Sequence, residues 1–113
     1  MKTVAYSSLM EAVNILKKIV PTKSSLPITE CVLIQQGSMH VTDLDNTVSV
    51  FIDNLPIGIN TVVSFKELEK VTKRLKGCDI EISGSGARFK LSSGKRSFMI
   101  KSEHLVEDFP KIL

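Results

Sequence analysis

Two residues with acid–base chemistry stand close together in the sequence, Asp43 and Asp45, which flank Leu44. Two carboxylates at this spacing could divide the roles of general acid and general base. The stretch Thr42-Asp43-Leu44-Asp45-Asn46 is also rich in residues that favour a turn between two strands. The turn is the favoured interpretation. An enzyme that acts through Asp43, Asp45 or a cysteine is the disfavoured alternative.

The other reactive side chains lack partners at the spacing that catalysis or metal binding needs. Cys31 and Cys78 stand 47 positions apart, which indicates buried free thiols rather than a zinc cluster or a redox dithiol. His40 and His104 have no spaced metal-ligand partner, and we expect His40 to point outward from its strand. Gly84-Ser85-Gly86 is too short for a phosphate-binding loop. We therefore expect no metal, no cofactor and no catalytic activity.

Positive charge is concentrated in the second half of the chain. The formal net charge is +3 and the pI is about 9.0. Residues 1–63 carry four basic residues against five acidic ones, whereas residues 64–113 carry eleven against seven. A basic surface of this kind favours an anionic partner.

The helix predicted to follow Ser64 carries much of this excess. At about 100° per residue, its polar side presents five basic residues, which are Lys66, Lys70, Lys73, Arg74 and Lys76. One interpretation is a solvated face on which Glu67 and Glu69 pair with nearby lysines. The alternative is a surface that contacts nucleic-acid phosphates independently of sequence.

An earlier predicted helix has a narrower polar side, centred on Asn14 and Lys18, with Lys17 at its margin. No aromatic residue interleaves with these charges, which argues against base stacking and against reading of base edges. Contact with the backbone of a duplex fits the pattern better. We expect the two helices side by side, with one exposed face that carries Lys18, Lys66, Lys70 and Lys73.

Both helices have start and stop signals in the sequence. A Ser-x-x-Glu capping box predicts that the first begins at Ser8, and Pro21 ends it. The second is predicted to begin in the same way at Ser64, and Gly77 ends it. The apolar stripes of both helices, together with two aromatic residues from strands, make up the predicted core: Leu9, Val13, Leu16, Leu68, Val71, Leu75, Phe89 and Phe98.

Each helix is preceded by one strand-like run and followed by three more, with turn residues between them. The predicted strands are Thr3–Tyr6, Ile28–Gln35, Met39–Thr42, Thr47–Asp53, Thr61–Val63, Asp79–Ser83, Ala87–Leu91 and Arg96–Lys101. The chain thus has a β-α-β-β-β unit twice, about residues 1–55 and 58–113, and an internal duplication explains the pattern. We expect one α+β domain over residues 1–113, with two helices packed on one face of an antiparallel sheet.

Length and composition are those of a globular domain. The chain has 113 residues, of which 42% are hydrophobic and 24% charged, and this favours neither disorder nor a coiled coil. No run of the sequence is long and apolar enough for a membrane span, and its start lacks the apolar core of a signal peptide. The expectation is a cytoplasmic protein without a membrane partner.

Four segments on this duplicated frame carry a resemblance to a known family. They are Leu26-Pro27-Ile28, Thr42-Asp43-Leu44, Ser93-Gly94-Lys95-Arg96-Ser97-Phe98 and Glu107-Asp108-Phe109-Pro110. In this order and spacing the chain resembles the N-terminal domain of the bacterial DNA polymerase III beta subunit, the sliding clamp. The resemblance covers essentially the whole chain and implies the DNA clamp fold. It also implies a non-catalytic part of a ring that encircles duplex DNA and confers processivity on the replicative polymerase.

The resemblance also implies roles for single residues. Lys23 matches a basic loop residue that touches DNA in the family, and Lys73 or Arg74 matches a basic residue late in the second helix. Together with the helical face, this makes the expected DNA-binding set Lys23, Lys73, Arg74, Lys70 and Lys18. Lys95 matches a residue at the subunit interface, where Arg96 takes the place of a second basic residue that relatives carry at Ser97. Lys66 is a further candidate for that interface.

The resemblance implies partners as well. In the family three such domains make a subunit and two subunits make the ring, so further clamp domains or subunits are expected partners beside DNA. The chain stops just past Phe109-Pro110, so polymerase and clamp loader are expected to bind only through domains absent here. It is either part of a longer protein or a natural single-domain relative. The alternative function is a stand-alone clamp-like module that binds protein through its sheet edges.

Overall fold

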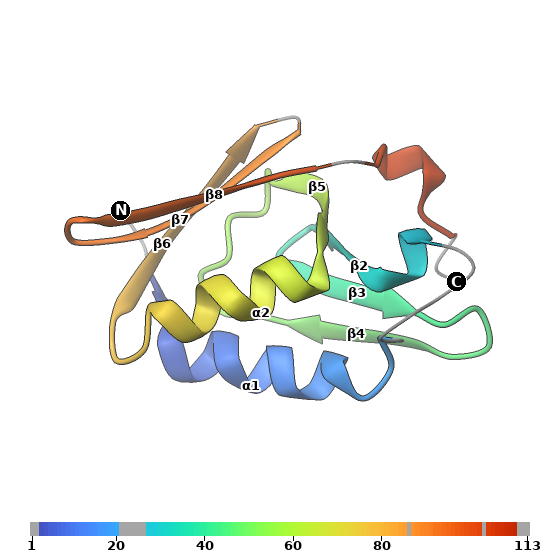
Figure 1. The fold of residues 1–113 in the computed structure, drawn as a ribbon, viewed down its shortest axis with the longest axis horizontal. Coiled ribbons are helices and arrows are strands. Elements are labelled where there is room, and N and C mark those ends of the chain that lie inside the picture. The colour runs from blue at the N-terminus through green and yellow to red at the C-terminus, as the bar shows by residue number, and fades with distance from the viewer. Residues whose placement is uncertain (1–2, 21–26, 86, 103, 111–113) are drawn as a thin grey trace.

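The computed structural model of the chain describes residues 3–20, 27–85, 87–102 and 104–110. The elements follow one another as two β-α-β-β-β units (Figure 1). The first unit consists of β1 (Val4–Ala5), α1 (Tyr6–Lys17), β2 (Cys31–Gln35), β3 (Ser38–Thr42) and β4 (Thr47–Phe51). The second consists of β5 (Asn60–Ser64), α2 (Phe65–Arg74), β6 (Asp79–Ser85), β7 (Arg88–Ser93) and β8 (Arg96–Lys101). The predicted succession of elements and the α+β class are confirmed.

The strands form two four-stranded antiparallel sheets, rather than the one sheet that the sequence predicts. Their orders are β4-β3-β2-β5 and β1-β6-β7-β8. Each sheet takes three strands from one unit and the first strand of the other, because β1 pairs with β6 (Val4 opposite Ile80) and β5 pairs with β2 (Val62 opposite Leu33). β5 and β8 lie near each other but are not paired. The exchange of first strands links the two units.

The two helices lie side by side and run in opposite directions (Figure 1). Their apolar stripes and the inner faces of both sheets enclose one core. The predicted core positions are confirmed as buried, except that Phe98 is half-buried and packs against that core. A smaller cluster lies on the outer face of β2 and β5, where the segment after β8 covers it with Phe109.

The first helix begins at Tyr6 and not at Ser8 as predicted. Its N-cap is Ala5, which has no side chain to cap the helix, and Ser8 lies exposed within the first turns. The earlier start follows from the strand before it, because β1 ends at Ala5 and leads directly into the helix. It also lets Tyr6 pack against the core, and such packing outweighs a single capping hydrogen bond of about 1 kcal/mol. The helix ends at Lys17, four positions before Pro21.

The second helix begins where the sequence predicts. The Ser64 side chain is the N-cap and accepts a hydrogen bond from the backbone N–H of Glu67 at 3.4 Å. The helix ends at Arg74, and Gly77 follows with a φ of 80°, a conformation that glycine adopts without strain. Sequence signals therefore located this helix correctly at both ends.

The strands confirm the predicted alternation with small shifts at their ends. Phe89 and Leu91 of β7 are buried, while Arg88 before them and Lys90 between them are exposed. The largest difference is at the start of β2, where Pro27–Glu30 forms a short 3-10 helix in place of strand. The strand therefore begins three residues later than predicted, at Cys31.

Candidate nucleic-acid interface

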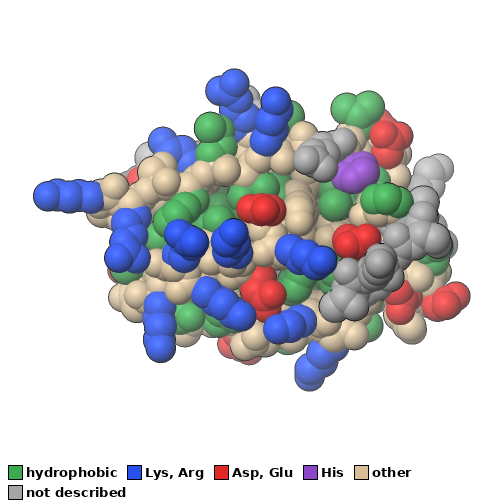
Figure 2. Space-filling model, viewed as in Figure 1, with side chains coloured by type: hydrophobic (Ala, Val, Ile, Leu, Met, Phe, Trp, Pro, Cys, Tyr) green, Lys and Arg blue, Asp and Glu red, His purple; other side chains and the backbone are tan. Residues whose placement is uncertain are grey.

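The exposed side of the two helices is covered by cations. Seven basic residues on α1, on α2 and directly after them are exposed: Lys17, Lys18, Lys66, Lys70, Lys73, Arg74 and Lys76. We call this set the helical basic face. Figure 2 shows Lys and Arg side chains gathered across the surface above both helices. The same surface carries three carboxylates, Glu11, Glu67 and Glu69, so positive charge dominates it.

The arrangement follows from helix periodicity. Lys66, Lys70 and Lys73 are spaced i, i+4 and i+7, which places them along one stripe. The residues of the opposite stripe, Leu68 and Val71, are buried. Because α1 lies beside α2, Lys17 and Lys18 at the end of α1 extend the charged surface across both helices. The expected exposure of Lys18, Lys66, Lys70 and Lys73 beside paired helices is confirmed.

Aromatic side chains are withdrawn from this face. Phe65 of α2 is buried, and Tyr6 of α1 is half-buried against the same core. Base stacking needs exposed aromatic rings, so the two helices offer no stacking platform. Flexible ammonium groups contact phosphates without reading bases.

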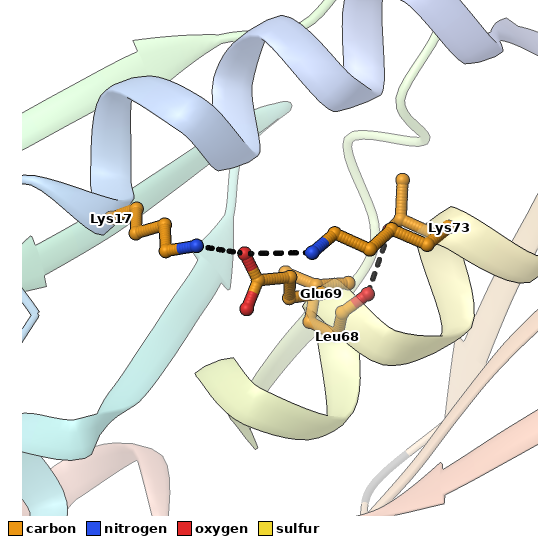
Figure 3. A network of polar contacts seen from close by, with 5 residues as sticks. Lys17, Leu68, Glu69 and Lys73 are labelled. Atoms are coloured by element: carbon orange, nitrogen blue, oxygen red, sulfur yellow. Dashed lines mark hydrogen bonds and ion pairs between the residues drawn. The ribbon is translucent and has the colours of Figure 1, made fainter. Parts of the chain in front are cut away.

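Glu69 links the two helices and orders part of the face (Figure 3). Its Oε2 lies 3.0 Å from Nζ of Lys17 on α1 and 3.7 Å from Nζ of Lys73 on α2. The Glu69 side chain is 18% exposed, whereas both lysine side chains are 58% exposed. The carboxylate therefore lies beneath two ammonium groups that remain open to solvent. The predicted pairing of acids with lysines is confirmed for Glu69; Glu67 has no ion pair with any residue that the structure describes.

Sequence reasoning missed the position of Lys17. The periodicity of α1 places it at the margin of the polar side, and the packing of α1 on α2 brings that margin next to Glu69. The i, i+4 spacing of Glu69 and Lys73 predicts the ion pair within α2. No pattern in the sequence predicts the ion pair between Lys17 on α1 and Glu69 on α2.

The predicted DNA-binding residues are brought together as far as the structure describes them. Lys70, Lys73 and Arg74 lie on α2, and Lys18 caps the C-terminal end of α1. Lys23 lies outside the described residues. Their contact with DNA stays a prediction, because exposure and clustering alone do not identify a ligand.

The predicted interface residues lie at two separate places. Lys95 and Arg96 are at the turn between β7 and β8, and Nη1 of Arg96 donates a hydrogen bond to the backbone oxygen of Arg74 at 2.7 Å. This bond satisfies a carbonyl at the C-terminal end of α2. Lys66 is eight residues earlier on the same helix, about 12 Å along its axis. The structure therefore does not bring Lys66 together with Lys95 and Arg96, and the interface role of all three stays a prediction.

Asp43 and Asp45 belong to the turn between β3 and β4, as the sequence favours. Oδ1 of Asp43 accepts hydrogen bonds from the backbone N–H groups of Asn46 and Asp45, at 2.6 and 3.0 Å. The bond from Asn46 is the main reason that the pKa of Asp43 lies below its usual value. Leu44 between the two acids has a φ of 80°. The carboxylate is engaged in holding the turn, which is not the arrangement of a catalytic pair.

The histidines and cysteines have no shared centre. His40 of β3 is half-buried, and its Nδ1 lies 2.6 Å from Oγ of Ser49 on β4. Burial lowers the pKa of His40. Cys31 is buried, but Cys78 is only half-buried, so the expectation of two buried thiols is wrong for Cys78. Within the described ranges, no three His, Cys, Asp or Glu residues are grouped as metal ligands. No helix in those ranges could cross a membrane.

Comparisons with known proteins found the same fold in several solved structures. A protein of Eubacterium rectale superposes with a TM-score of 0.82 at 24% identity over 97% of this chain. The DNA polymerase III beta subunit of Thermotoga maritima gives a TM-score of 0.79 at 26% identity over 98%. The Helicobacter pylori beta clamp bound to a DNA ligase peptide gives 0.77 at 14% identity over 98%. None of the curated proteins matches the chain.

The chain spans only 32% of the length of each of these three structures. All of residues 1–113 match the family described as DNA polymerase III beta subunit, N-terminal domain. The match confirms the resemblance drawn from the four sequence segments. The chain belongs to the family of the DNA polymerase III beta subunit N-terminal domain.

Proposed function

We propose that the helical basic face binds the backbone of duplex DNA and that the chain acts as one domain of a sliding-clamp ring. In such a ring the helices face the enclosed duplex and the chain confers processivity on a replicative polymerase without catalysis of its own. The observation that carries the proposal is the cluster of seven exposed cations on two adjacent helices and directly after them, in a chain of the clamp family.

Loose contact with phosphates suits this role. A clamp must stay on DNA of any sequence and still move along it, so its contacts should be sequence-independent and easily exchanged. Exposed lysines make contacts of this kind, since ammonium groups interact with phosphates as point charges. Glu69 also lowers the net positive charge of the helical basic face because it pairs with Lys17 and Lys73.

Removal of charges from one face tests the proposal. In the helical variant, Lys66, Lys70 and Lys73 are replaced by Gln, and binding to a fluorescent duplex is followed by anisotropy across a range of salt concentrations. For the isolated chain we expect a Kd no tighter than about 10⁻⁴–10⁻⁶ M. The variant should reduce the slope of log K against log salt by up to about 0.9 per lost phosphate contact. Duplexes of unrelated sequence should be affected equally.

A matched variant on two strands, outside the helical basic face, is the control. Arg88, Lys90 and Lys101 are exposed residues of β7 and β8, and their replacement by Gln removes the same number of charges. This control should leave the salt slope unchanged. Equal losses in both variants would contradict the proposal, because they would mean attraction by net charge and not a binding face.

Encirclement is tested by topology. The 113-residue chain alone contributes two helices, and the family's ring needs six such domains, so we expect equal affinity for linear and circular DNA and no retention at moderate salt. A protein that carries three such domains in each subunit should be retained on circular DNA and released when the DNA is linearised. Retention of circular DNA by the isolated chain would contradict the need for further domains.

A second candidate function is a clamp-like module that binds protein through its sheet edges. Its support is that β4 and β8 are terminal strands of their sheets and can accept an added strand. Absence of any salt-dependent duplex binding, together with binding of a partner strand, would favour this candidate over the clamp.

A further inference from the structure

The contact between Lys17, Glu69 and Lys73 brings two cations from different helices to one point of the helical basic face (Figure 3). Lys17 is the last residue of α1, and Lys73 lies one turn after Glu69 on α2. Their Nζ atoms lie 3.0 and 3.7 Å from the same carboxylate oxygen, Oε2 of Glu69. Among the described residues, no other cation of this face has an ion pair. The place where the two helices meet thus differs in its charges from the rest of the face.

Two ammonium groups this close together need an anion between them. Like charges repel each other across a few ångströms, and the repulsion is offset when an opposite charge lies within ion-pair distance of both. In the structure this anion is the Glu69 carboxylate. A phosphate oxygen of a duplex is also negatively charged and accepts the same contacts from lysine. The two lysines therefore form a site that fits one phosphate and that Glu69 occupies.

The carboxylate is held in this site by charge and not by directional bonds. Oε2 of Glu69 is shielded from solvent, yet it accepts no hydrogen bond from any residue that the structure describes. The two ammonium groups therefore stand within ion-pair distance of Oε2 but outside hydrogen-bond geometry. A shielded carboxylate oxygen of this kind has lost water without a full replacement for it. Rotation of the Glu69 side chain toward solvent restores that hydration, which lowers the cost of displacing the carboxylate.

A phosphate can reach the two ammonium groups from the solvent side. Both lysine side chains are 58% exposed, whereas the Glu69 side chain beneath them is 18% exposed. Each ammonium group lies at the end of a flexible stem and has three rotatable donors. It can turn from the carboxylate to a phosphate without movement of the helices. Exchange of one anion for the other therefore needs only side-chain rotation.

We infer that Glu69 is a built-in competitor of the duplex: Lys17 and Lys73 form a single phosphate site across the two helices, and a phosphate binds there by displacing the Glu69 carboxylate. The inference rests on the proposed function, because it concerns the same face and the same ligand. The two cations are never left unpaired, since the carboxylate returns when the phosphate leaves. An internal anion of this kind weakens each phosphate contact and speeds exchange between phosphates, as movement along DNA requires.

Two carboxylates of α2 provide a matched pair of variants. Glu69→Gln and Glu67→Gln each remove one negative charge from the same helix, but only Glu69 has an ion pair with a lysine among the described residues. Binding to a short fluorescein-labelled duplex of mixed sequence is measured by anisotropy across a range of salt concentrations. We expect Glu69→Gln to raise duplex affinity by about threefold to tenfold and Glu67→Gln to raise it by less than about twofold. Glu69→Gln should also steepen the slope of log K against log salt by about 0.9, because no displaced carboxylate then takes up a counterion.

Removal of the two lysines tests whether the gain in affinity depends on them. In a chain with Lys17→Gln and Lys73→Gln, Glu69→Gln should raise duplex affinity no more than Glu67→Gln does. A gain that persists without these lysines would overturn the inference, because it would mean a general effect of net charge. A second measurement needs no variant: the carboxyl ¹³C NMR signal of Glu69, and not that of Glu67, should shift when duplex is added to the parent chain. A Glu69 signal that stays in place while the duplex binds would also overturn the inference.

The outcomes separate this inference from the proposed function. If the helical variant weakens duplex binding while Glu69→Gln leaves it unchanged or lowers it, the proposed function stands and the inference is wrong. Glu69 would then only link the helices or position the lysines. If neither the helical variant nor Glu69→Gln changes duplex affinity, both are wrong. Urea denaturation checks that each variant is folded, and the NMR measurement on the parent chain decides alone if Glu69→Gln does not fold.

Discussion

The two helices hold equivalent places in the two units, yet their exposed sides differ. Both bury an apolar stripe in the same core, Leu9, Val13 and Leu16 on α1 and Leu68 and Val71 on α2. Basic residues occur along the length of α2, whereas those of α1 are gathered at its end. The buried stripe is thus common to both copies because the fold requires it, and the exposed side is free to carry the DNA-binding function that we propose.

The largest loss of stability should come from truncation of the buried apolar residues that both units contribute to the core. Leu16 closes the stripe of α1, Leu75 follows α2, and both are 0% exposed. Leu16→Ala and Leu75→Ala should each lower the free energy of unfolding by about 2–5 kcal/mol, because each leaves a cavity in the same core. Urea denaturation measures this. Ile15→Ala is the control, since Ile15 is 37% exposed and its truncation should cost much less.

Similar losses for Leu16→Ala and Leu75→Ala would sharpen the comparison by showing that the two units contribute alike to one core. A loss of stability below about 1 kcal/mol at either position would contradict the comparison. It would mean that the packing of that helix does not depend on its buried stripe.

The next largest loss of stability should distinguish the N-terminal ends of the two helices. Ser64 caps α2 through its side chain, whereas Ser8 is exposed inside α1 and caps nothing. Ser64→Ala should cost about 0.5–2 kcal/mol of stability, and Ser8→Ala should change it by less than about 0.5 kcal/mol. Thermal or urea unfolding of the two variants gives the difference. Equal losses would mean that Ser8 has a role in the first helix that its position does not show.

The same two serines show how far the sequence predicts the fold. A Ser-x-x-Glu pattern stands at both sites, and only at Ser64 does the preceding strand end where the pattern expects. At the first site β1 ends at Ala5 because its pairing with β6 ends there, and that pairing joins Val4 to Ile80 and Ala5 to Asp79, far apart in the chain. Periodicity and turn residues therefore located the elements, but strand partners far apart in sequence decided their ends and divided one expected sheet into two.

The candidate site divides in the same way. Lys66, Lys70 and Lys73 could be grouped from the sequence because a helix places them on one side by its own geometry. The ion pair between Lys17 and Glu69 and the bond from Arg96 to the end of α2 depend on how separate elements pack. No local pattern contains that information, so these contacts could not be predicted.

A smaller effect should come from the link between the helices. Glu69→Gln removes the carboxylate shared by Lys17 and Lys73 and should lower stability by about 0.2–1 kcal/mol, the usual range for exposed ion pairs. The same change should raise duplex affinity, since it frees two ammonium groups and removes a negative charge from the helical basic face. Unfolding and duplex anisotropy measured on one sample test both signs. A loss of duplex affinity would show that Glu69 positions the lysines for binding and does not compete with the phosphates.

The smallest effect compares the outer faces of the two sheets. His40 opposite Ser49 in the first sheet has the same place in its hairpin as Lys90 opposite Met99 in the second. One face thus has a half-buried imidazole with a hydroxyl partner, and the other has an exposed lysine beside a thioether. The first is sensitive to pH near neutrality, whereas lysine keeps its charge there.

Burial lowers the pKa of His40 in the folded chain from its usual value of 6.5, so the unfolded chain binds the proton more tightly. As the pH falls below about 6.5 the unfolded chain takes up the proton first, and stability falls until the pH drops below the folded pKa, where the loss becomes constant. His40→Gln should remove this part of the pH dependence, so the parent chain should lose more stability between pH 7.5 and 5.5 than the variant does. Lys90→Gln should leave that dependence unchanged. A parent chain that gains stability over this interval relative to His40→Gln would show that the folded state favours the protonated imidazole, and the contrast between the two outer faces would then be one of degree only.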